Sequence, residues 1–192
     1  MVDTYLLDWL QSNKVQKYLY NNFYSKCKSC EIVKDKKRQL KGIDVIINDE
    51  YFIDEKSTEF KGPEHIHSYF LELTVTDKNG IEREGWAVKD NDTTHYLITW
   101  YKKDRQGNIY YSDHILISSE AIKRFVWLFN NKDELILPED IKEAQKLKLS
   151  QGPAPENSKL IIVPEWLLRK YAEYTFKIND NILNDIVFNG GK

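Results

Sequence analysis

Short apolar runs separated by polar, turn-forming sequence follow one another through the middle of the chain, and residues 68–76 alternate with the two-residue period of a β-strand. Two short apolar runs, at 43–48 and 51–56, are separated by Asn-Asp-Glu. Asn and Asp tolerate the left-handed backbone of a tight turn, so the pattern predicts an antiparallel hairpin. The apolar segments that follow are separated by turn-forming sequence and are predicted to be strands at 68–76, 85–89, 95–103 and 108–118.

Two segments have apolar residues at intervals of three or four, which is the helical period: 4–24 and 118–130. Ser118 or Ser119 supplies an N-cap for the second of these helices. Residues 160–174 have the pattern of a short strand followed by a helix that starts at Pro164. The order of these elements predicts an α/β fold with a mixed central β-sheet flanked by helices.

The length of 192 residues fits one domain with a small appended piece. Residues 1–150 are predicted to form the main domain. Residues 151–192 are expected to be a C-terminal strand-helix extension packed on the same domain. The polar stretch at 151–158 joins them as a linker or exposed loop.

Composition agrees with a folded chain, since 41% of the residues are hydrophobic and 13% are aromatic. The net charge of −2 indicates no polyanionic partner, but residues 26–41 contain seven basic residues against two acidic ones. This basic segment has the character of a phosphate-backbone contact, or of a solvated loop. No secretory signal and no apolar stretch near the roughly 18 residues of a membrane span are present, which predicts a soluble, cytoplasmic protein. Cys27 and Cys30 form a lone CKSC without a second pair, and we expect reduced thiols.

The predicted hairpin carries charged residues at its open end. Asp54 and Lys56 are two residues apart and leave the same face of a strand, while Glu55 points the other way. A turn at 48–51 brings Asp44 opposite roughly residue 55, so the two aspartates and the lysine converge. Two carboxylates suit Mg²⁺ or Mn²⁺, and the ammonium group suits an attacking water or a phosphate. The alternative is that Asp44 only begins a strand and that Asp54 and Lys56 form a surface salt bridge.

The segment GID, an apolar run and IDEK resembles the PD-(D/E)xK nuclease superfamily, which has the restriction-endonuclease-like fold. Asp44 matches the first acid of that pattern, Asp54 the second and Lys56 the lysine. Glu55 does not match the second acid, because Ser57 would then stand at the lysine position. The chain departs from the pattern at Ile43, where proline is frequent. The resemblance covers mainly residues 38–58.

The resemblance implies a metal-dependent nuclease that hydrolyses DNA, with Asp44 and Asp54 binding Mg²⁺ or Mn²⁺ and the backbone carbonyl of Glu55 as a further ligand. Lys56 would serve the attacking water, and a homodimer is compatible with the resemblance. Gln39 is a candidate for contacting the phosphate or the water. Glu72 lies in an apolar strand and is either a third metal ligand or an edge residue in contact with water. Two alternatives stay open: a nucleic-acid-binding module of the same fold that does not cut, and a protein whose partner is not a nucleic acid.

Overall fold

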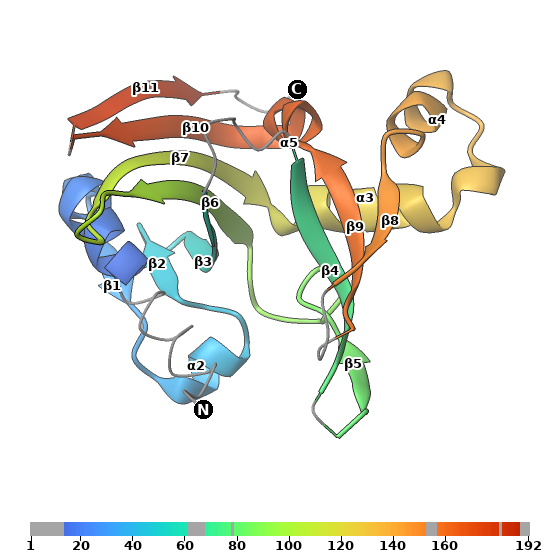
Figure 1. Ribbon diagram of the computed structural model, residues 1–192, viewed down its shortest axis with the longest axis horizontal. Coiled ribbons are helices and arrows are strands. Elements are labelled where there is room, and N and C mark those ends of the chain that lie inside the picture. The colour runs from blue at the N-terminus through green and yellow to red at the C-terminus, as the bar shows by residue number, and fades with distance from the viewer. Residues whose placement is uncertain (1–13, 61–67, 78, 153–156, 181, 189–192) are drawn as a thin grey trace.

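The computed structural model describes residues 14–60, 68–77, 79–152, 157–180 and 182–188, and it has an α/β fold (Figure 1). The strands form two sheets rather than the one central sheet that the sequence suggested. The larger sheet is mixed, and its seven strands lie in the order β1 (Cys30–Ile32), β2 (Val45–Ile47), β3 (Tyr51–Glu59), β6 (His95–Lys103), β7 (Ile109–Ser118), β10 (Ala172–Asn179) and β11 (Ile182–Phe188). The smaller sheet has the order β5 (Glu82–Glu84), β4 (Ser68–Thr76), β9 (Lys159–Pro164) and β8 (Lys148–Gln151).

Strands β6 and β7 lie at the centre of the large sheet, and both are buried along most of their length. Strands covered on both faces need apolar residues at successive positions, which explains the continuous runs YLITWY and HILI. Strand β3 pairs with β6 in parallel, whereas the other pairs of this sheet are antiparallel.

The predicted hairpin is confirmed. Strands β2 and β3 are antiparallel, with Ile47 opposite Tyr51. The turn between them uses the residue types that the sequence singled out, since Asn48 and Asp49 have φ of 53° and 58°. Short polar side chains make this left-handed backbone accessible, so the turn sets the register of the two strands.

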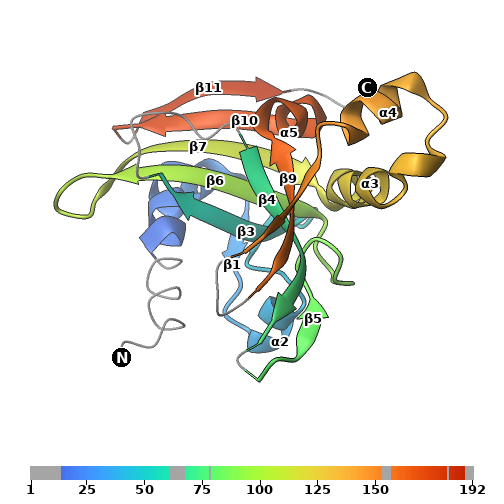
Figure 2. The same cartoon turned by 45° about the vertical axis from the view of Figure 1, so that its right-hand side comes forward.

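The main core lies between the two sheets and the helices that close one side of them, α3 (Ser119–Asn130) and α5 (Glu165–Tyr171). Strands β4 and β9 cross the large sheet at a steep angle (Figures 1 and 2). Helix α3 begins as predicted, because the Ser118 hydroxyl accepts a hydrogen bond from the Ala121 amide. Ile122, Phe125 and Leu128 then face the core.

A second core covers the opposite face of the large sheet. It includes Leu19 and Tyr24, which come from the helix at 14–22 and the 3-10 turn η1 (Tyr24–Lys26). The helix predicted at 4–24 is therefore found over 14–22, and its first part lies outside the described residues. The remaining helical elements are α2 (Lys36–Leu40), η2 (Lys132–Glu134) and α4 (Pro138–Ala144).

Two sequence predictions are wrong in detail. The helix predicted to continue to residue 174 ends at Tyr171, and Ala172 begins strand β10, which pairs with β7. Helical propensity is overridden here because β10 contributes Phe176 and Ile178 to the second core. The segment predicted as a strand at 85–89 is a turn, for reasons given below.

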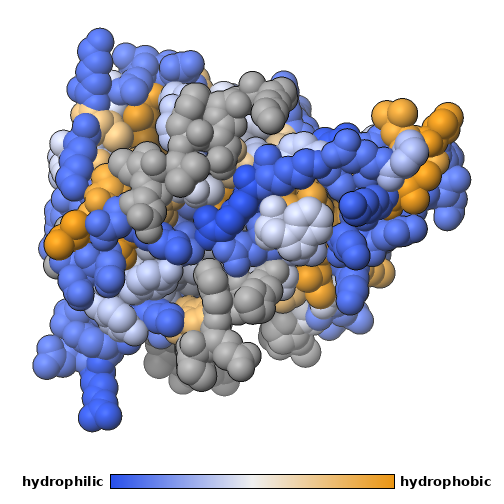
Figure 3. Space-filling view, turned by 90° about the horizontal axis from the view of Figure 1, so that it is seen from above, coloured by the Kyte–Doolittle hydropathy of each residue, from blue (hydrophilic) through white to orange (hydrophobic). Residues whose placement is uncertain are grey.

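Residues from 151–192 contribute to both sheets, since β9 pairs with β4 and β10 pairs with β7. The polar stretch at 151–158 begins with the last residue of β8 and precedes β9, and the Gly152 amide donates a hydrogen bond to the Ser158 carbonyl across it. It therefore joins two neighbouring strands of one sheet. None of the described helices is long and apolar enough to cross a membrane. On the face seen in Figure 3, hydrophobic residues form small separate groups among hydrophilic ones.

Candidate active site

Asp44, Asp54 and Lys56 lie together on one face of the β2–β3 hairpin. Continuing the register of the two strands places Asp44 opposite Asp54, one residue away from the position expected from the sequence. The Asp44 amide donates a hydrogen bond to the Ile53 carbonyl (2.8 Å), and Asp44 Oδ2 accepts one from the Glu55 amide (3.0 Å). The backbone of β3 therefore holds the Asp44 carboxylate beside Asp54.

Lys56 contacts Asp54 directly. The distance from Lys56 Nζ to Asp54 Oδ1 is 2.5 Å, and both side chains leave the same face of β3. The side chain of Asp54 is 7% exposed and that of Lys56 is 24% exposed. Asp54 is thus buried and Lys56 is partly exposed, so the pair is more enclosed than the surface salt bridge considered as the alternative.

The protonation of this pair is shifted by its surroundings. The pKa of Asp54 is raised to about 6, mainly by burial; Lys56 opposes this rise, and Asp44 adds to it by repulsion and by a hydrogen bond. Burial lowers the pKa of Lys56, but the attraction of Asp54 and Asp44 outweighs this and leaves its pKa above the ordinary value. Lys56 is therefore a charged hydrogen-bond donor near neutral pH and is unsuited to act as a base.

The Glu55 side chain lies on the opposite face of β3, as the period of the strand predicts. Its carboxylate accepts hydrogen bonds from Tyr24 Oη (2.5 Å) and Gln16 Nε2 (2.8 Å). The backbone carbonyl of a residue in an extended strand points to the same side as its amide, and the Glu55 amide points at Asp44. Of the oxygen atoms of Glu55, only that of the backbone carbonyl can therefore lie on the side of the two aspartates, and this carbonyl is the metal ligand that the family resemblance implies.

Burial raises the pKa of Glu55 to about 7, and this predicts a pH-dependent stability. The ordinary pKa is 4.5, so between these two values the folded protein holds a proton that the unfolded chain releases. The free energy of unfolding should fall as the pH rises through this window. Glu55→Gln should flatten that fall, as measured by urea denaturation at about pH 5 and about pH 8. An unchanged slope in the variant would contradict this origin.

Both aspartates and the lysine line a pocket of about 240 Å³. Its walls come from α2, the loop after it, the hairpin and the segment before β6, and the lining residues are Gln39, Leu40, Gly42, Asp44, Asp54, Lys56, Trp86, Lys89 and Asn91. The Trp86 ring covers Lys56, with Nζ 5.4 Å from the ring centroid. Such a contact between a cation and a ring favours the charged form of the lysine.

The turn at 85–89 places Trp86 over the pocket, and Gly85 explains why this segment is not a strand. A Cβ at Gly85 would lie 2.3 Å from the Glu72 carbonyl oxygen, so only glycine fits against β4. The amides of Gly85 and Ala87 donate to the carbonyls of Leu73 and Glu72, and the chain then turns instead of extending. Trp86, Lys89 and Asn91 were not among the site residues expected from the sequence; the Gly85-Trp86 pair was a signal for Trp86 alone, whose ring also packs against the main core.

The two supporting candidates have different outcomes. Gln39 lines the pocket, but its Nε2 donates to the Val33 carbonyl (2.9 Å), which turns the amide toward the backbone. Glu72 belongs to β4 in the smaller sheet and is not among the residues that line the pocket. The structure therefore brings Gln39, and not Glu72, to the edge of the candidate site.

The two cysteines lie away from this pocket and pack against the second core. Burial raises the pKa of Cys27, and it raises that of Cys30 to about 11. Thiols that keep their protons at neutral pH are poor nucleophiles, and both cysteines are free in the structure.

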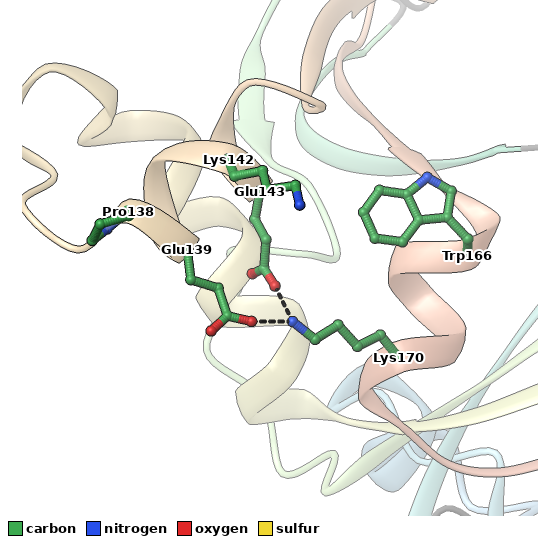
Figure 4. A pocket seen from close by; sticks show the side chains of 6 residues that line it. All are labelled: Pro138, Glu139, Lys142, Glu143, Trp166 and Lys170. Carbon is green, nitrogen blue, oxygen red and sulfur yellow. Dashed lines mark hydrogen bonds and ion pairs between the residues drawn. The ribbon is translucent and has the colours of Figure 1, made fainter.

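A larger pocket of about 330 Å³ lies between α4 and α5 (Figure 4). Lys170 Nζ contacts Glu139 (2.5 Å) and Glu143 (2.6 Å) on its wall, and Trp166 faces them across the opening. Tyr171 Oη also donates to Glu143, whose side chain is 4% exposed. These contacts satisfy the buried carboxylate internally, so the charges at this pocket connect the two helices.

The described residues contain no group of three or more His, Cys, Asp or Glu side chains that could hold a metal ion. The candidate site offers two carboxylates and one backbone carbonyl. No protein-family model, curated protein or solved structure matches the chain. The function is therefore inferred from the residues of this pocket and from the sequence pattern they carry.

Proposed function

We propose that this protein is a Mg²⁺- or Mn²⁺-dependent nuclease that hydrolyses DNA phosphodiester bonds, with a fold related to that of the restriction endonucleases. The observation that carries the proposal is one pocket lined by Asp44, Asp54 and Lys56 together. The resemblance of the same three residues to the PD-(D/E)xK pattern supports it independently of the geometry.

The donor set fits a hard divalent cation. Asp44, Asp54 and the Glu55 carbonyl supply oxygen only, and Mg²⁺ commonly takes one or two carboxylates and completes its shell with water and phosphate oxygens. Asp54 and Asp44 are close enough to share a hydrogen bond, and their repulsion contributes to the raised pKa of Asp54. A cation between them would relieve this repulsion, so its binding competes with protonation.

Each residue then has a chemical role. The bound metal would polarise the phosphodiester and lower the pKa of a water molecule. Asp44 and Asp54 would hold and orient the metal ion. The Lys56 ammonium donates a hydrogen bond to the attacking water or to the phosphate oxygen on which negative charge grows, and Trp86 limits its movement. The basic residues of α2, next to the pocket, are suited to contact the flanking phosphates.

A nucleic-acid-binding module that does not cut is the second candidate. It is favoured by the ion pair between Lys56 and Asp54, which compensates the buried charge of Asp54 without any metal. Under this alternative the basic segment binds phosphates while the two aspartates have only a structural role.

Nicking of supercoiled plasmid distinguishes these functions. We expect the purified protein to convert the plasmid to the open-circular form with Mg²⁺ or Mn²⁺ and to leave it intact in EDTA. A gel shift without nicking under either condition would favour the binding module. No shift at low salt, where phosphate contacts are strongest, would favour a partner other than nucleic acid.

A further inference from the structure

A second pocket, of about 400 Å³, lies beside the candidate active site. Its floor is apolar and consists of Ile43, Ile46 and Phe52. Ile43 and Ile46 are almost fully buried, and Phe52 is partly exposed. Ile46 and Phe52 are directly opposite each other in the β2–β3 ladder, so they form one continuous surface.

The two pockets follow each other along the same face of the hairpin. Phe52 lines the second pocket and Asp54 the first, and two residues along a strand are separated by about 6.6 Å on one face. Ile43 in the second pocket is likewise followed in the chain by Asp44 in the first. A strand whose scissile phosphate lies at Asp54 can therefore place its next nucleotide over Phe52.

The rim of the second pocket is basic, with Lys37, Arg38 and Lys41 above the apolar floor. Arg38 pairs with Glu31, and Lys41 with Asp92, but all four side chains are about half exposed or more. Exposed pairs contribute little to stability and exchange readily for other anions. An apolar floor under a cationic rim matches a nucleotide, which combines a flat base with a phosphate.

We propose that this second pocket holds the base of the nucleotide next to the scissile phosphate, with the base lying on Phe52. This inference rests on the proposed function and specifies its substrate. A base can lie on Phe52 only after leaving its helical stack, so the preferred substrate has an unpaired nucleotide at that position, as in single strands, frayed ends or flipped nucleotides.

Binding of a short fluorescent single strand, followed by anisotropy in EDTA, tests the proposal without requiring cleavage. Phe52→Leu keeps an apolar floor but removes the aromatic face. Because stacking of a base on an aromatic ring contributes about 1–3 kcal/mol, this variant should bind at least about five-fold more weakly. On a strand of the same length made of abasic units, Phe52→Leu and the wild type should bind equally.

Phe70→Leu is the matched control, since Phe70 is an exposed phenylalanine on β4 and should change neither affinity. Equal binding of Phe52→Leu and the wild type to the normal strand would overturn the proposal, and so would an equal loss on both strands. A wild type that nicks plasmid while Phe52→Leu binds normally would overturn only the base pocket. A wild type that shows the base-dependent loss but never cuts would overturn only the nuclease. A wild type that binds neither strand would overturn the base pocket, and plasmid nicking would still decide the nuclease separately.

Discussion

Asp54→Asn should abolish metal-dependent cleavage, with a rate at least about a hundred-fold below that of the wild type. The substitution keeps the size of the side chain but removes the charge that would hold the cation beside Asp44. It also removes a carboxylate whose ionised form is destabilised by burial, as its raised pKa shows, and the side chain of Lys56 is 24% exposed and can reach water, so the fold should tolerate it. Plasmid nicking at a fixed Mg²⁺ concentration measures the rate, and circular dichroism with thermal unfolding measures the fold.

Two matched variants show whether the loss is specific. Glu55→Gln changes the next residue of β3 but on the opposite face, and it keeps the backbone carbonyl, so cleavage should persist. Asp90→Asn changes an exposed acid in the segment near the pocket and should have no effect. Full activity of Asp54→Asn, or an equal loss in Glu55→Gln, would refute the assignment of Asp54 as a metal ligand.

The second large effect is expected on stability, from Arg124 between α3 and α4. Arg124 Nη2 contacts Asp140 (2.6 Å) and Glu143 (3.3 Å), and its Nε donates to Tyr171 Oη (3.3 Å). Arg124→Met removes a positive charge that balances Asp140 and Glu143, whose side chains are 14% and 4% exposed. Arg124 is 32% exposed and Glu143 keeps its contacts with Lys170 and Tyr171, so we expect a cost of about 2 kcal/mol of unfolding free energy, below that of a fully buried pair. Urea denaturation of the wild type and the variant gives the difference.

Glu143→Met is the matched control for this network and should cost less. The side chain of Glu143 is 4% exposed, whereas those of Arg124 and Lys170 are 32% and 42% exposed. When Glu143 is removed, Arg124 and Lys170 can reach water. When Arg124 is removed, the Glu143 carboxylate cannot. A greater loss of unfolding free energy for Glu143→Met than for Arg124→Met would contradict this explanation, because it would show that the cations do not regain contact with water.

Several elements could be predicted from sequence because their cause is local. The hairpin follows from two apolar runs and the left-handed Asn48 and Asp49, and α3 follows from its apolar period and the Ser118 cap. The central strands β6 and β7 were found within a residue of their bounds. Strand period also placed Asp54 and Lys56 on one face and Glu55 on the other, because it depends only on the spacing along the chain.

The errors have non-local causes. The turn at 85–89 depends on the contact of Gly85 with the backbone of β4, which no local pattern contains. The strand after Tyr171 forms because β7 offers it a partner, although its sequence continues the predicted helix. The division into two sheets also depends on pairings between distant segments, such as β4 with β9.

The sequence by itself determined that Asp54 and Lys56 share one face of the hairpin and that Asp44 lies near them at its open end, since strand geometry is fixed by the backbone. Only the tertiary structure decided that Trp86 covers Lys56, that Gln39 bonds to the backbone and that Glu72 belongs to another sheet. It also placed the apolar pocket of Phe52 beside the two aspartates. These features arise from packing between segments far apart in the chain, and packing is set by the whole fold.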